Sequence, residues 1–65
     1  MPIVRIELFP GRSADKKAEI GREITKVLET VAGIKSTATT VIFTEISPSD
    51  WMVGGEPLAR QTPPK

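Results

Sequence analysis

The chain has 65 residues, with nine basic and eight acidic side chains and a formal net charge of +1. This balance gives no basic footprint for nucleic acid or an anionic membrane surface, and no apolar run approaches the ~20 residues of a membrane span. Histidine and cysteine are absent, which excludes disulfides and thiolate metal sites and removes two common neutral-pH catalysts. We expect a soluble cytoplasmic protein that uses no metal or other cofactor.

The length fits a single domain spanning residues 1–65. A domain this small buries only about 60% of the surface that its unfolded chain exposes, so it is marginally stable alone. Small domains recover stability from disulfides, metals or oligomerisation. Since the composition argues against the first two, we expect self-association.

Residues 3–8 alternate between two faces, of which Val4, Ile6 and Leu8 form the more apolar one. This period of two predicts a β-strand. Pro10 and Gly11 follow it and favour a turn, because proline cannot donate to a ladder and glycine tolerates turn geometry.

A helix of about five turns is predicted next. Ser13 is suited to the N-cap, Asp15 to the first turn, and Gly33 to the residue just past the C-terminus. Gly21 lies inside this segment and costs about 1 kcal/mol relative to alanine; a close contact with the sheet or another subunit would explain it. Apolar residues recur at spacings of three and four, at Ile20, Ile24, Val27, Leu28 and Val31.

Residues 38–46 are rich in β-branched and aromatic types and predict a second strand. Residues 47–50 read as a turn, residues 51–56 as a short hairpin, and residues 59–65 as a flexible tail. The chain is therefore an α+β protein: a β-α-β unit with a C-terminal hairpin. The helix crossover favours a parallel strand pair with a right-handed connection. One sheet face and its edges stay uncovered, which again favours oligomerisation.

Pro2 follows the initiator methionine and begins the first strand. If Met1 is removed, Pro2 carries a free secondary amine at a position held by the strand. An α-amino group titrates near about 7.7–8.0, and burial or a nearby cation lowers that pKa. Such an amine can accept a proton at neutral pH and return it elsewhere.

Two further side chains could either take part in a substrate site or have only a surface or packing role. Arg12, in the loop before the helix, could hold a substrate carboxylate through paired hydrogen bonds, or it could be a solvated surface arginine. Trp51, the single tryptophan, could form an apolar wall beside the amine, or it could fill a core or an interface.

Several short motifs follow one another across residues 2–58: Pro2-Ile3, then Phe9-Pro10-Gly11-Arg12-Ser13 before a lysine-rich helix start, then Val41-Ile42-Phe43-Thr44-Glu45, then Trp51 and Val53-Gly54-Gly55-Glu56. In this order and spacing they resemble the 4-oxalocrotonate tautomerases, a family with a catalytic amino-terminal proline.

The resemblance implies an isomerase that interconverts a 2-hydroxy dienoate and its 2-oxo isomer, as in aromatic compound degradation. It implies that Pro2 is the general base and that Arg12 binds a substrate carboxylate from another subunit. Phe9, Trp51 and Val53 match positions that line the substrate pocket. The assembly it implies is a homohexamer, built as a trimer of dimers; mixed hexamers with a second sequence also occur in the superfamily.

Thr40 departs from the family pattern, because well-studied members carry a second arginine at this position. Losing a positioned donor to a developing oxyanion typically costs ~10²–10³ in rate. A less charged substrate, Arg5, Arg60 or a partner subunit of different sequence could compensate.

Three alternatives to the tautomerase interpretation remain. The first is a hydratase or dehalogenase that acts on unsaturated acids, for which Glu7, Glu45 or Glu56 would activate water. The second is a low-activity or non-catalytic subunit of a mixed hexamer, which Thr40 motivates. A nucleic-acid module is the least favoured, since the basic residues cluster only on the helix.

Overall fold

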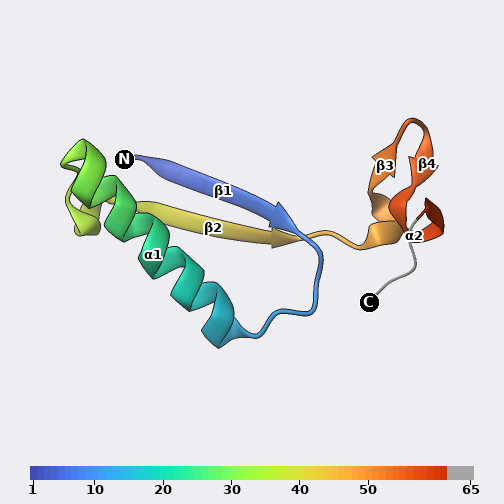
Figure 1. Ribbon diagram of the computed structural model, residues 1–65, viewed down its shortest axis with the longest axis horizontal. Helices are drawn as coiled ribbons and strands as arrows, with labels where there is room; N and C mark the ends of the chain where they lie inside the picture. The colour runs from blue at the N-terminus through green and yellow to red at the C-terminus, as the bar shows by residue number, and fades with distance from the viewer. Residues whose placement is uncertain (62–65) are drawn as a thin grey trace.

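A computed structural model describes residues 1–61 of the chain. Strand β1 (Ile3–Leu8) leads through a loop to helix α1 (Ala14–Ala32), and a single-turn 3₁₀-helix η1 (Ser36–Ala38) precedes strand β2 (Thr40–Glu45). A second 3₁₀ turn, η2 (Pro48–Asp50), connects to the short strands β3 (Met52–Val53) and β4 (Glu56–Pro57) and to helix α2 (Leu58–Gln61). Figure 1 shows the hairpin standing beyond one end of the β1–β2 pair, with the amino terminus at the other end.

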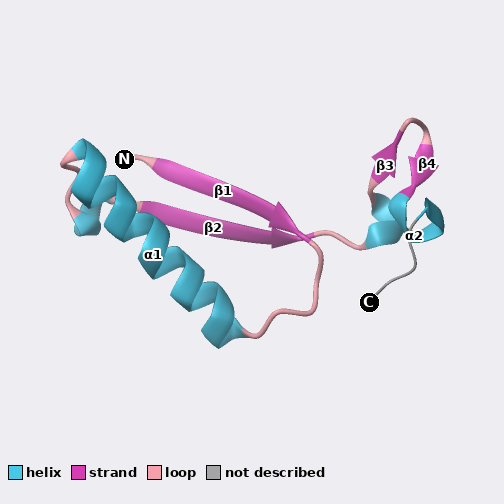
Figure 2. Cartoon of the chain, viewed as in Figure 1, coloured by secondary structure: helices cyan, strands magenta, loops and turns pink. Residues whose placement is uncertain are grey.

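Strands β1 and β2 form a parallel pair in which Ile3 lies opposite Thr40 and Leu8 lies opposite Glu45. Backbone hydrogen bonds extend the ladder at both ends, from the Thr40 amide to the Pro2 carbonyl at 3.0 Å and from the Ile46 amide to the Leu8 carbonyl at 2.8 Å. The predicted β-α-β unit with a C-terminal hairpin is therefore confirmed. The crossover helix α1 runs beside the two strands (Figure 2).

Both predicted ends of α1 are confirmed. The Ser13 Oγ atom accepts a hydrogen bond from the Lys16 amide at 3.1 Å, which satisfies one of the free N–H groups of the first turn. At the other end, Gly33 has φ 69° in the left-handed region, and its amide donates to the Glu29 carbonyl at 3.0 Å. Glycine suits this position because it has no Cβ to clash in that conformation.

The two faces of the β1–β2 sheet differ in burial. Val4, Ile6 and Leu8 are half-buried, whereas Ile3, Arg5 and Glu7 on the opposite face are exposed. Helix α1 packs on the first of these faces, since a Cβ added to Gly21 would lie 3.8 Å from Phe43 and 4.0 Å from Val41. The opposite face has no covering layer within the described residues.

None of residues 1–59 reaches full burial. The radius of gyration of 14.9 Å exceeds the roughly 11 Å of a compact domain of this length. Large apolar side chains stay exposed on the helix and the hairpin, including Val31 at 81% and Met52 at 55%. A chain of this shape removes little apolar surface from water by itself.

The predicted hairpin is confirmed and is closed by a two-residue turn. Met52 pairs with Pro57 and Val53 with Glu56 in antiparallel register. Gly54 and Gly55 have φ values of 62° and 85°, the double positive φ that a type I′ turn requires and that glycine adopts without strain.

Two details of the chain path differ from the sequence-based expectation. The second strand covers residues 40–45 rather than 38–46, because the Ala38 amide bonds to the Lys35 carbonyl at 2.9 Å and residues 36–38 close a 3₁₀ turn instead. Helix α2 was not predicted and occupies the beginning of the expected tail, while residues 62–65 of that tail lie outside the described residues. No helix within residues 1–61 has the length and apolar character needed to cross a bilayer.

Gly21 provides a test of the helix–sheet packing. Of the two contacts that could explain this glycine, the contact with the sheet is present, but the 3.8 Å gap to Phe43 leaves room for a methyl group. Gly21→Ala should therefore raise the unfolding free energy by up to about 1 kcal/mol. Gly33→Ala is the matched control and should lower it by about 1–2 kcal/mol, because alanine is strained at positive φ. Thermal unfolding at equal protomer concentration measures both; destabilisation by Gly21→Ala would contradict the described packing.

Candidate functional site

Pro2 lies at the amino-terminal end of β1. It is half-buried, and its carbonyl accepts the Thr40 amide in the last hydrogen bond at this end of the ladder. Met1 precedes it with 81% of its surface exposed. The ladder therefore holds Pro2 in a defined place, whereas the residue before it extends into solvent. This is the placement that a terminal amine needs if it is to act as a positioned base.

Phe9 and Trp51 meet at the opposite end of the sheet. Their ring centroids are 4.8 Å apart with an interplanar angle of 65°, an edge-to-face arrangement. Phe9 follows β1 directly, and Trp51 precedes the hairpin, so the contact ties the two segments together. The Leu58 amide donates to the Trp51 carbonyl at 2.8 Å and fixes the base of the hairpin. The pair forms a small aromatic wall beside the loop that carries Arg12.

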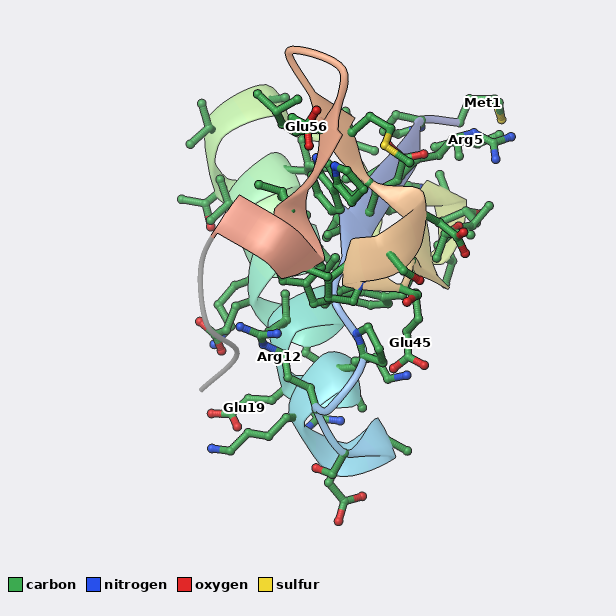
Figure 3. The ribbon with its side chains drawn as sticks, turned by 90° about the vertical axis from the view of Figure 1, so that its right-hand side faces the viewer. Met1, Arg5, Arg12, Glu19, Glu45 and Glu56 are labelled. Carbon is green, nitrogen blue, oxygen red and sulfur yellow. The ribbon has the colours of Figure 1, made fainter. Side chains whose placement is uncertain are left out.

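Arg12 lies in the loop between β1 and α1 and is exposed. Figure 3 shows its guanidinium extending from this loop below the hairpin. No hydrogen bond or ion pair involves this side chain within residues 1–61. Val53 is on β3 with 52% of its surface exposed. Both side chains are accessible to a ligand or to another chain.

The predicted site residues are divided between the two ends of the molecule. Pro2 is at one end of β1, while Phe9, Arg12 and Trp51 are at the other. A strand of six residues rises by about 3.3 Å per residue, so the two groups are about 20 Å apart. Within one chain, Pro2 and Arg12 therefore lie at opposite ends of β1.

Thr40 lies opposite Ile3 on the exposed face of the sheet. Alternation along β1 places Arg5 on this same face, opposite Ile42. Arg5 is therefore a positively charged side chain on the same sheet face as Thr40. The Arg60 side chain lies outside the described residues.

The carboxylates of the hydratase alternative differ in their surroundings. Glu45 is paired with Lys17 at 3.0 Å, linking the end of β2 to the start of α1. Glu7 is exposed on the uncovered sheet face, and Glu56 lies in the hairpin at register with Val53. Within residues 1–61, no three potential metal-ligating His, Cys, Asp or Glu side chains cluster together.

Thr39 is a feature that the sequence analysis missed. Its Oγ1 atom is buried and has no hydrogen-bond partner among the described residues. Whether the Thr39 hydroxyl is buried depends on which face of the sheet its side chain lies on. The 3₁₀ turn before β2 determines that face. Strand alternation could have placed Thr39 beside Val41 on the apolar face, had the start of the strand been known.

Comparison with known proteins identifies the family. Residues 2–61 match the family model described as tautomerase enzyme. The chain belongs to the tautomerase family. A probable tautomerase of Lactococcus lactis is 41% identical over 56 residues, which cover 86% of this chain and 92% of the relative. A probable tautomerase of Ralstonia nicotianae is 40% identical over 55 residues, covering 85% of each.

Solved structures of the family agree with this fold. TomN, a 4-oxalocrotonate tautomerase homologue of the tomaymycin biosynthetic pathway, is 34% identical, with a TM-score of 0.84 over 97% of this chain and all of TomN. A heterohexamer 4-oxalocrotonate tautomerase from Chloroflexus aurantiacus is 29% identical, with a TM-score of 0.83 over 95% of this chain and 100% of that chain. Membership of this family supports a tautomerase-type, isomerase activity.

Trp51 is the sole tryptophan of the chain, and its fluorescence therefore reports on the aromatic contact. Phe9→Ala should shift its emission to longer wavelength, because the indole loses the edge-to-face ring and gains water. Such pairs contribute about 0.5–1.5 kcal/mol beyond burial, so a modest loss of stability should accompany the shift. Met52→Ala, next to Trp51 but exposed, is the control and should leave the emission unchanged. An unaltered spectrum in Phe9→Ala would rule out the contact.

Proposed function

We propose that the protein is a cofactor-independent cytoplasmic tautomerase that interconverts the 2-hydroxy-dienoate and 2-oxo forms of a small unsaturated carboxylic acid. In this proposal Met1 is removed and the Pro2 amine is the general base. The observation that carries it is the placement of Pro2 at the fixed end of the β1–β2 ladder in a chain of the tautomerase family.

The reaction needs only a proton carrier and charge stabilisation. The Pro2 nitrogen takes the proton of the 2-hydroxyl group, the electrons form the 2-oxo carbonyl, and the conjugated double bond shifts along the chain. The same nitrogen then returns the proton to the distal carbon, so the enzyme ends in its starting state. A secondary amine can do this near neutral pH when its pKa lies close to the working pH.

Arg12 and the aromatic pair take complementary roles. The Arg12 guanidinium binds the substrate carboxylate through two parallel hydrogen bonds and draws electron density toward that end. Phe9 and Trp51, with Val53, form an apolar wall that excludes water. An apolar wall also disfavours the charged form of a nearby amine. Both functions require these residues to meet a Pro2 that belongs to another chain.

The missing core and the divided site support an oligomeric enzyme. An uncovered sheet face, exposed apolar residues on α1, and an exposed hairpin are three surfaces that neighbouring chains could cover. We propose a homohexamer, a trimer of dimers, in which each site takes Pro2 from one chain and Arg12 from another.

A subunit of a mixed hexamer is a second candidate. Thr40 replaces the arginine that the family resemblance implies, and a threonine supplies one hydrogen-bond donor without charge. A structurally similar relative is a heterohexamer. Purification from the native host would distinguish the two, since a second tautomerase-like chain in fixed ratio supports the mixed assembly.

The base is tested directly by Pro2→Ala. If Pro2 transfers the proton, ketonisation of 2-hydroxymuconate, followed by absorbance, should slow by about 10²-fold or more in this variant. Intact mass spectrometry of the native sample should show a chain without Met1. Arg22→Ala, which changes an exposed arginine on α1, is the control and should retain activity. Equal rates for native and Pro2→Ala protein would contradict the proposal.

The divided site makes a separate prediction. Arg12→Ala should lower kcat/KM by about 10- to 100-fold, since a charge-assisted bond to the carboxylate is lost. Mixing it with Pro2→Ala after unfolding and refolding should restore up to about a quarter of native activity, because some sites then combine an intact Pro2 with an intact Arg12. Refolding each variant alone is the control. Activity of the mixture no higher than the mean of the two refolded variants would show that both residues act from one chain.

A further inference from the structure

Thr39 carries a polar group that the structure leaves without a partner. Its Oγ1 atom is buried and unbonded within residues 1–61. Buried hydroxyls are nearly always hydrogen-bonded, because leaving one unpaired after it has lost its water is unfavourable. An unpaired buried hydroxyl beside the candidate base suggests that its hydrogen-bond partner is missing while Met1 is attached.

The strand register places Thr39 beside Pro2. Ile3 lies opposite Thr40. Extending this register by one residue places Thr39 across from Pro2, in agreement with the hydrogen bond from the Thr40 amide to the Pro2 carbonyl. Neighbouring strands are about 4.8 Å apart. Alternation puts Pro2 and Thr39 on the same face as Val4 and Val41, which is the face that α1 covers. Thr40 itself lies on the opposite, exposed face.

The orientation of Pro2 directs its nitrogen toward β2. The Pro2 carbonyl accepts the Thr40 amide, and in an extended residue the nitrogen and the carbonyl face the same neighbouring strand. With Met1 attached, this nitrogen is a tertiary amide that neither donates nor accepts. Removal of Met1 would turn it into an amine, or an ammonium with two N–H groups, on the side of Pro2 that faces β2 and Thr39.

We propose that Thr39 is a positioning residue whose hydroxyl hydrogen-bonds the Pro2 amine once Met1 has been removed. A hydroxyl can accept from the ammonium form and donate to the neutral form, so it can hold the nitrogen in one orientation through a proton-transfer cycle. This inference rests on the proposed function because both require the removal of Met1. It concerns the Pro2 amine and not the substrate.

The effect on the amine has a definite sign. The bond that the hydroxyl accepts from the ammonium is charge-assisted and stronger than the bond it donates to the neutral amine. The hydroxyl therefore favours the charged form and raises the pKa of Pro2 relative to a chain without it. Thr39→Val keeps the shape and removes the hydroxyl, so the pKa of Pro2 should fall by about half a unit to one unit. The charged residues on the elements that meet at this end, Arg5, Glu29 and Lys35, are unchanged by the substitution.

The experiment is a ¹⁵N NMR titration of Pro2 in proline-labelled, Met1-free protein. Native protein and Thr39→Ser, which retains a hydroxyl, should titrate alike, and Thr39→Val should titrate lower. Thr44→Val, an exposed threonine of β2, is the matched control and should match native protein. Identical titrations of native protein and Thr39→Val would overturn the inference.

A second measurement separates positioning from simple packing. In protein that keeps Met1, prepared with the host methionine aminopeptidase inhibited, the hydroxyl has no partner and Thr39→Val should raise Tm. In processed protein the same substitution should lower Tm. An equal shift in both forms would contradict the proposal. If the titrations of native protein and Thr39→Val differ but native protein has no tautomerase activity, the proposed function fails while the Thr39 contact stands.

Discussion

The parallel β1–β2 ladder is the constraint on which the rest of the structure depends. It holds Pro2 at one end through the Thr40 amide and joins Leu8 to Ile46 at the other, close to the loop of Arg12 and the hairpin. Because parallel strands require a crossover, α1 has to run back along the sheet and can cover only one of its faces. The position of Pro2 and the exposure of the other face thus have a common origin.

That geometry ties stability to assembly. With no described residue fully buried, the chain has little apolar burial to offset the conformational entropy lost on folding. The same surfaces that need covering lie next to the two halves of the candidate site. Subunit contacts would therefore stabilise the fold and complete the site together, and a substitution at an interface would be expected to affect both.

The composition of this chain limits which groups could act as a base, and the main candidate is a backbone amine rather than a side chain. Without histidine or cysteine, a base near neutral pH has to be a perturbed side chain or the terminal amine. In the proposed function, Thr40 supplies no positive charge, which leaves Arg12 as the main proposed contact for an anionic substrate. The hydroxyl of Thr39, on the covered face, is the uncharged partner that we propose for the amine.

The sequence by itself determined the local elements and the identity of the candidate base. Alternation in residues 3–8, the Ser13 cap, Gly33 and Gly54-Gly55 were sufficient because each depends on contacts a few residues apart. The 3₁₀ turn before β2 and helix α2 were missed, since competing short hydrogen bonds, not side-chain pattern, decide them. Only the tertiary structure showed that Pro2 and Arg12 lie about a strand length apart and that the Thr39 hydroxyl is buried opposite Pro2. The first follows from the extended path of β1. The second depends on strand register, which is fixed by pairing between residues nearly forty positions apart and cannot be read from either strand alone.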